Sequence, residues 1–177
     1  MLTSDSFWRK LDQSQRFMLF VHSGAGSHCL HGKVARRFSP VAFEHPEGVE
    51  HASLRGAVSM FFLGDELRHY DYLVRCVRDP LRAIYSFAMF LHTNTKTPWH
   101  SALAISACSM VAFDTSTSLL TANVIRVEDV RGEEDVDLNA RVSPKPTWKE
   151  MQAEIPWVVP AVKDMFVRYR YSAEEYN

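Results

Sequence analysis

The sequence has few cysteines and almost no net charge, and both features narrow the classes of protein to consider. Its three cysteines form no CxxC pair and no Cys/His zinc pattern, so we expect reduced thiols: Cys29, Cys76 and Cys108. The formal net charge is −1, which leaves no global positive field to attract nucleic acid or an anionic membrane. We therefore expect no nucleic-acid partner, and any bound anion must be held by a local site.

Long apolar runs are also missing. No stretch of 18 consecutive apolar residues occurs, and the first residues, MLTSDSFWRKLDQSQRF, are polar and mixed in charge. A membrane span needs about 20 apolar residues and a signal peptide needs an apolar core, so we expect no membrane association and a cytoplasmic location. With 46% hydrophobic and 23% charged residues, the chain has the composition of a soluble globular protein, and its length suits a single domain over residues 1–177.

What the sequence does contain is an alternation of short apolar runs and helix-like segments. The runs that suit buried strands are Phe17–Val21, Pro40–Glu44, Tyr72–Val77 and Ala122–Val130. Helical periodicity or capping signals occur at 3–13, Leu30–Phe38, Ser53–Leu63, Leu81–His92, Trp99–Leu120, from Thr147 onward, and at Val158–Tyr169. This alternation predicts an α/β three-layer sandwich with a central, mostly parallel sheet of about four to five strands.

The first predicted strand leads directly into a loop of small and polar residues. In an open parallel sheet, ligands bind at the carboxyl ends of strands, near helix N-termini. The loop could direct backbone N–H groups at an anion, helped by the partial positive charge of the next helix; an ordinary strand-to-helix turn would need the same small residues. Its candidate ligand-binding residues are Ser23, Gly24, Ala25, Gly26, Ser27 and His28.

This loop does not match the P-loop of nucleoside triphosphatases. Five residues, where the motif has four, separate Gly26 from Gly32-Lys33, and Val34 stands where Ser or Thr would bind magnesium. A conventional ATPase or GTPase is therefore not expected. A P-loop kinase for a small substrate is the weakest of the functions considered.

The segment VRDPLRAIYS carries a more specific pattern. Arg78 is the first residue beyond an apolar strand, and Ser86 follows eight residues later, about two turns into the next helix. The pair can clamp one phosphate, the arginine bidentately and the serine through its hydroxyl. Arg75 and Arg82 are further cations expected near the same edge. The alternative is a surface arginine beside a helix-initiating turn.

RDPLRAIYS resembles the 3′-phosphate-binding motif of the sulfotransferase family, an Arg followed by Asp-Pro or Asn-Pro and then a Ser eight positions after the Arg. Three further segments resemble the family's 5′-phosphosulfate loop, its strand ending in Tyr-Glu-Asp-Leu and its late Met…Tyr-Gly-Tyr helix end: FVHSGAGSHCL (20–30), VIRVEDV (124–130) and MFVRYRYS (165–172). The resemblance implies a sulfotransferase fold of the P-loop-NTPase type. It also implies 3′-phosphoadenosine 5′-phosphosulfate (PAPS) as cofactor, adenosine 3′,5′-bisphosphate as product, and sulfuryl transfer to a hydroxyl or amine of a small-molecule or glycan acceptor.

The sequence departs from the family pattern in its first loop. The family has a lysine before its Ser/Thr-Gly, and His22 occupies that place here. His22 is therefore a catalytic candidate, as a positive or hydrogen-bonding group. Alternatively, Gly26-Ser27 aligns with the family's Gly-Thr, with His28 or Lys33 nearby. The missing lysine motivates a second function, a catalytically degenerate nucleotide-binding or scaffold protein of the same fold.

A base near the acceptor would assist sulfuryl transfer, and His or Glu is the usual choice. In HPEGVEHAS (45–53), the resemblance to cytosolic sulfotransferases favours His51 as this catalytic residue, with Glu44, His45 and Glu50 as rivals. The chain is short for the family, so the acceptor pocket is minimal, open or completed by a partner subunit. A homodimer is one arrangement that would complete it.

Two other groups of titratable residues are given structural roles. Glu128 and Asp129, at the end of the predicted fourth strand, are interpreted as polar supports for neighbouring loops. The closely spaced histidines lack a matching carboxylate or cysteine set, so we expect no metal at His22, His28 and His31.

Overall fold

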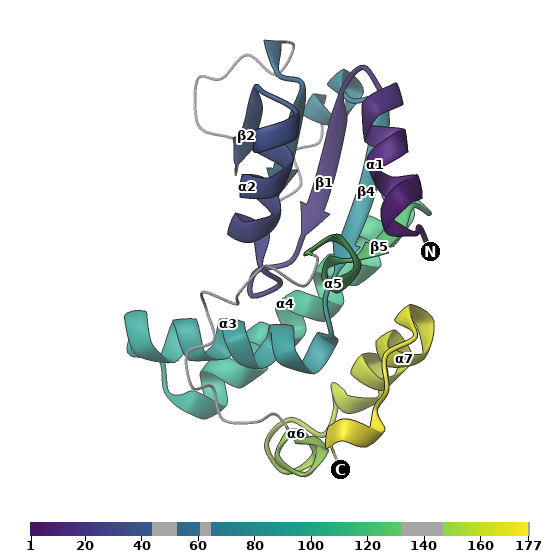
Figure 1. The fold of residues 1–177 in the computed structure, drawn as a ribbon. Helices are drawn as coiled ribbons and strands as arrows, with labels where there is room; N and C mark the ends of the chain where they lie inside the picture. The colour runs from purple at the N-terminus through teal and green to yellow at the C-terminus, as the bar shows by residue number, and fades with distance from the viewer. Residues whose placement is uncertain (44–52, 61–64, 132–146, 177) are drawn as a thin grey trace.

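The computed structural model describes residues 1–43, 53–60, 65–131 and 147–176, and it shows an α/β fold built on one parallel sheet (Figure 1). Five strands are hydrogen-bonded in the order β2-β3-β1-β4-β5, and every described pair is parallel. The strands are β1 (Phe17–Val21), β2 (Val41–Phe43), β3 (Gly56–Ser59), β4 (Tyr72–Val77) and β5 (Val124–Arg126). The expected α/β class and parallel sheet are confirmed.

Helices flank this sheet. They are α1 (Ser4–Gln13), α2 (Ser27–Arg37), α3 (Pro80–Asn94), α4 (Trp99–Leu120), α5 (Val127–Arg131), α6 (Trp148–Glu154) and α7 (Val159–Tyr169), with 3₁₀ helices at Asp65–His69 and Glu174–Tyr176. In Figure 1, α2 is drawn to the left of β1 and α1 to its right, and α3 lies below the end at which β1 leads into its loop.

The two faces of β1 enter different packing clusters, as the alternation of side chains along a strand requires. One face packs against α1 and α2 and contributes Phe17, Leu19 and Val21; the helices contribute Phe7, Leu11, Leu30 and Val34. The other face contributes Met18 and Phe20, against which Phe113 of α4 packs. Helices on both faces of the sheet are compatible with a three-layer sandwich.

The prediction of a helix at Ser53–Leu63 is wrong, because part of this segment forms β3. All four residues of β3 are buried between β1 and β2. Gly56 is required there, since a Cβ at this position would lie 2.3 Å from the Phe17 ring. The four residues of β3 do not alternate between apolar and polar, so their sequence alone does not predict a strand. They form one because they pair with β1 on one side and with β2 on the other.

The predicted strand Ala122–Val130 is too long. Of this segment, Val124–Arg126 forms the strand β5, and the helix α5 begins at the next residue, Val127. The predicted helix at Leu30–Phe38 begins too late, because α2 starts at Ser27 and therefore includes Ser27 and His28 of the predicted loop. The strands β1 and β4 and the helix α4 have the predicted ends, and α3 extends the predicted helix to Asn94.

Helix α4 has the length and apolar composition of a membrane span, with a mean hydropathy of 1.4 over an 18-residue stretch. In this fold it packs against α3 and β4 and buries an acidic residue, Asp114, which pairs with Arg75. The apolar stretch of α4 is 39% buried in this fold. The expected location of the protein stays a prediction.

Candidate functional site

The strand order creates a switch point between β1 and β4. The connection after β1 leads through α2 to β2 on one side of the sheet, whereas the connection after β4 leads through α3 and α4 to β5 on the other side. In open α/β sheets, ligands bind in the crevice outside the carboxyl ends of strands at such a point. The two segments that the sequence singled out, 22–28 and 78–86, follow these two strands.

The loop after β1 needs both of its glycines. Gly24 and Gly26 have φ angles of 81° and 80°, in the left-handed region that favours glycine. A Cβ on Gly24 would lie 2.5 Å from the carbonyl oxygen of Ala83, so only glycine lets the loop lie this close to α3. Gly26 is the N-cap of α2. The first N–H groups of that helix have no acceptors within the helix itself, and they emerge from this loop.

Arg78 joins the two segments. Its Nη1 donates a hydrogen bond of 2.8 Å to the carbonyl oxygen of Gly24. Gly24 packs against the segment of α3 from Ala83 to Phe87, and the half-buried Ser86 belongs to this segment. The predicted loop, arginine and serine thus lie at one edge of the sheet. Backbone N–H groups, a guanidinium and hydroxyls at one edge can bind an oxyanion.

On the opposite side of the loop lies Met60, directly after β3. Ser23 Oγ and Ser27 Oγ both donate to its sulfur, at 3.2 and 3.7 Å. Met60 has no local sequence signal that connects it with the loop, because β3 brings it there only through pairing with β1. The loop is thus flanked by Met60 on the β3 side and by Arg78 on the β4 side.

His22 is buried and stays neutral. Its side chain lies between the rings of Phe87 and Phe113, at centroid distances of 5.9 and 5.6 Å, and Nε2 is 3.3 Å from Ser109 Oγ. Burial lowers its pKa from 6.5 to about 4, which a contact with the backbone of Ser23 offsets only in part. His22 therefore supplies no positive charge near neutral pH. It occupies the position at which the sulfotransferase loop motif has a lysine.

The other basic candidates near the loop are directed elsewhere. His28 is exposed, with its ring 4.5 Å from that of Phe43. Lys33 Nζ donates to the carbonyl oxygen of Val130, at 3.1 Å. Within the described part of the chain, no three His, Cys, Asp or Glu side chains are grouped to hold a metal ion. His51 and its rivals Glu44, His45 and Glu50 lie outside the described residues.

Asp79 holds the turn that carries Arg78. Its carboxylate accepts hydrogen bonds from the backbone N–H of Arg82 (3.1 Å) and from the Tyr176 hydroxyl (2.7 Å). Its own N–H donates to Glu128, which also accepts a hydrogen bond from Tyr171 at 2.8 Å. Burial, opposed by these donors, raises the pKa of Asp79. The helix-capping role of Asp79 is readable from Asp-Pro, but its partners from the C-terminal segment are not.

The structural roles given to Glu128 and Asp129 agree with these contacts. Glu128 holds the turn after β4. Asp129 binds the guanidinium of Arg126 through two hydrogen bonds of 3.0 and 2.8 Å.

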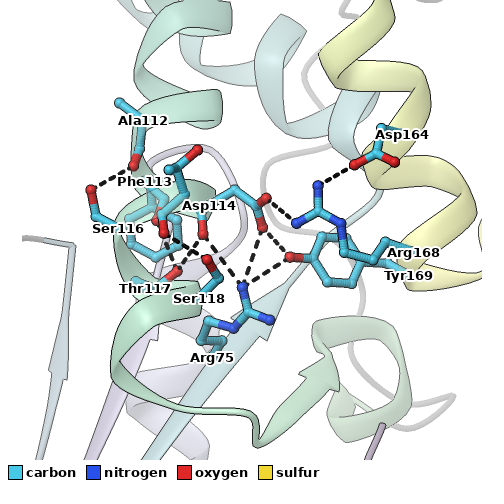
Figure 2. A network of polar contacts seen from close by, with 11 residues as sticks. Arg75, Ala112, Phe113, Asp114, Ser116, Thr117, Ser118, Asp164, Arg168 and Tyr169 are labelled. Carbon is cyan, nitrogen blue, oxygen red and sulfur yellow. Dashed lines mark hydrogen bonds and ion pairs between the residues drawn. The ribbon is translucent and has the colours of Figure 1, made fainter.

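The expectation that Arg75 lies at the sheet edge is wrong. Arg75 pairs in register with Phe20 of β1 and Val124 of β5, and it is only 6% exposed. Figure 2 shows its guanidinium directed at Asp114 and Tyr169, whose Oδ1 and hydroxyl lie 3.5 and 3.1 Å from Nη1. Arg168 completes the group with a 2.6 Å contact to Asp114. Arg75 is therefore neutralised in the core, where the network joins β4, α4 and α7.

A separate cavity of about 330 Å³ opens beside β5 and is lined by Met1, Leu2, Thr3, Ser4, Arg126, Asp129 and Arg170. It includes none of the predicted site residues. Its Arg126 is already bound to Asp129. The arrangement at the β1–β4 switch point is therefore the stronger candidate site.

The architecture defines the class, an α/β protein with a five-stranded parallel sheet. Comparison with models of known protein families finds no match, and comparisons with curated proteins and with solved structures find no significant match.

Proposed function

We propose that this chain binds a 3′-phosphorylated adenosine nucleotide at the β1–β4 switch point and acts as a sulfotransferase with PAPS as cofactor. The observation that carries the proposal is the 2.8 Å hydrogen bond between Arg78 and Gly24, which joins the two motifs that resemble sulfotransferase sequences. The acceptor would be a hydroxyl or amine of a small molecule or glycan.

We assign the donor groups at this edge to the two phosphorylated ends of the nucleotide. Arg78 and Ser86 come from the segment that resembles the 3′-phosphate motif, and they are the groups we assign to that phosphate. The first turn of α2 and the hydroxyls of Ser23 and Ser27 provide donors for the 5′ end. Gly24 and Gly26 allow the left-handed conformation of the loop, and the missing Cβ at Gly24 lets the loop lie against α3.

The cofactor, when bound, supplies the sulfuryl group and its leaving group. Sulfuryl transfer resembles phosphoryl transfer, in which the protein mainly positions the reactants in line and stabilises charge on nonbridging oxygens. The N–H groups of the first turn of α2, which have no acceptors within the helix, are the donors we assign to that stabilisation. A general base would accept the proton of the acceptor hydroxyl, and His51 remains the assigned residue for this step.

One observation favours a second function, nucleotide binding without transfer. The buried His22 carries no charge at neutral pH, so it cannot stabilise the leaving group as the lysine of the family loop would. A protein that binds the nucleotide as a scaffold would retain Arg78, Ser86 and the glycine loop and would tolerate this change.

Calorimetric titration with adenosine 3′,5′-bisphosphate tests the nucleotide site, with AMP and Mg-ATP as comparison ligands. We expect binding that requires the 3′-phosphate and that weakens about 10-fold to 100-fold in Arg78→Ala, because a charged hydrogen-bonding partner of the phosphate is lost. Arg36→Ala is the matched control, since Arg36 is an exposed arginine whose Nε donates to the carbonyl oxygen of Gly32 in its own helix. Unchanged affinity in Arg78→Ala would reject the assignment.

Incubation with radiolabelled PAPS and a panel of hydroxyl and amine acceptors separates the two functions. Transfer of label to any acceptor rules out the non-catalytic function. Tight binding of the bisphosphate without transfer to the panel supports it.

A further inference from the structure

Two hydroxyl groups of the loop converge on a single sulfur atom. Ser23 and Ser27 stand on either side of Gly24-Ala25-Gly26, and both donate to Met60 Sδ, at 3.2 and 3.7 Å. Met60 is separated from them by 37 and 33 residues in the sequence. It reaches them because β3 is hydrogen-bonded to β1, so both strands end at the same edge. The convergence is therefore a product of the sheet order.

The sulfur is a poor partner for these hydroxyls. A thioether is a weak hydrogen-bond acceptor, whereas an ionised phosphate or sulfate oxygen forms hydrogen bonds roughly twice as strong as neutral ones. Ser27 is only 5% exposed, so its hydroxyl has little access to water as an alternative. An oxyanion that reached this point would offer both hydroxyls a better acceptor than they have.

The surroundings of the sulfur suit an anion. Ser27 is the first residue of α2, so its hydroxyl lies beside the partial positive charge of a helix N-terminus. Gly24, between the two serines, is held by the Arg78 guanidinium. The methionine side chain has three rotatable bonds and is half-buried, so it can turn aside without moving the backbone of β3.

We propose that Met60 Sδ occupies the position of an oxygen atom of the bound oxyanion, and that Met60 must rotate away for a phosphate or sulfate group to reach Ser23 and Ser27. This inference rests on the proposed function for the identity of the oxyanion, the 5′ end of the nucleotide. Met60 is then a residue that lowers the affinity of the loop for anions, so that a ligand with few other contacts, such as inorganic sulfate, displaces the sulfur only at high concentration.

Nuclear magnetic resonance of the full chain labelled at the methionine methyl groups tests the displacement directly. The Met60 signal is assigned by its loss in Met60→Leu. We expect it to shift on addition of adenosine 3′,5′-bisphosphate, and also in millimolar inorganic sulfate. Calorimetry on the same samples reports whether the nucleotide binds at all.

The outcomes separate the two proposals. A shift in sulfate without nucleotide binding supports the displacement and rejects the nucleotide function. Nucleotide binding with an unmoved Met60 signal overturns the displacement and leaves the nucleotide function standing. If neither ligand moves the signal and the nucleotide does not bind, both proposals fail.

Affinity provides a second readout. Met60→Ala removes the competing acceptor and its bulk, so we expect roughly 3-fold to 10-fold tighter binding of the bisphosphate, the effect of one or two weak hydrogen bonds. Met89→Ala, at a methionine of α3 with similar exposure, is the matched control. Unchanged or weaker binding in Met60→Ala contradicts the displacement.

Discussion

Tyr176 and Asp79 are 97 residues apart in the sequence, and the Tyr176 hydroxyl donates a hydrogen bond of 2.7 Å to the Asp79 carboxylate. The same hydroxyl accepts a hydrogen bond from Arg82 Nε at 2.9 Å. Asp79 directly follows Arg78 and caps α3. The C-terminal segment therefore stabilises the turn on which the candidate phosphate-binding arginine stands.

Tyr176→Phe should destabilise the protein by about 1–2 kcal/mol, because the buried Asp79 carboxylate loses a donor. Urea unfolding measures this loss. Tyr72→Phe is the control, since the buried Tyr72 hydroxyl has no hydrogen-bond partner among the described residues and its removal should cost little. Equal effects of the two substitutions would contradict the role of Tyr176.

Gly24→Ala should destabilise the protein by about 1–3 kcal/mol and abolish nucleotide binding. The new Cβ would meet the Ala83 carbonyl oxygen at 2.5 Å, and the φ angle of 81° is unfavourable for alanine. Gly32→Ala is the matched control: its Cβ would meet nothing within 4 Å, and alanine in a helix is favoured over glycine by about 0.5–1 kcal/mol. Thermal unfolding and calorimetry of both variants decide the matter, and a stable, binding-competent Gly24→Ala would show that the loop conformation is not required.

The buried His22 should make stability depend on pH. Its folded-state pKa of about 4 lies below the ordinary value of 6.5, so the unfolded chain binds a proton that the folded chain does not between these values. The free energy of unfolding therefore falls as the pH is lowered from about 6.5 to about 4, and the total loss is about 3 kcal/mol. Above about pH 6.5, His22 is neutral in both states and this loss is absent.

His22→Phe, which cannot take up a proton, should flatten this pH dependence when urea unfolding is compared across the same range. His28→Phe, a change at an exposed histidine, should leave the dependence as it is in the parent protein. Parallel curves for His22→Phe and the parent protein would mean that another group is responsible.

Asp114→Ala should cost about 3–5 kcal/mol, because it leaves the buried Arg75 charge without its acidic partner. Asp164→Ala removes the other acidic partner of Arg168, but this carboxylate is exposed and the change should cost less than about 1 kcal/mol. Denaturant unfolding measures both. Comparable losses would show that burial of Asp114 does not govern its contribution.

The sequence by itself determined the features that depend on local pattern. The short apolar run of β1 predicts a buried strand without knowledge of its neighbours. The long, mostly apolar segment of α4 predicts both ends of that helix. Asp-Pro after β4 predicts a capped helix start, and Asp79 caps α3. The Arg78–Ser86 spacing and the glycines after β1 identified the two segments that meet at the candidate site.

Only the tertiary structure decided what depends on distant partners. The residues of β3 became a strand because β1 and β2 pair with them on both sides, and Arg75 became a core residue because α4 and α7 supply Asp114 and Tyr169. The neutrality of His22 and the position of Met60 also depend on neighbours that are remote in the sequence. Burial and hydrogen bonding are set by which elements pack together, and local periodicity contains no information about that choice.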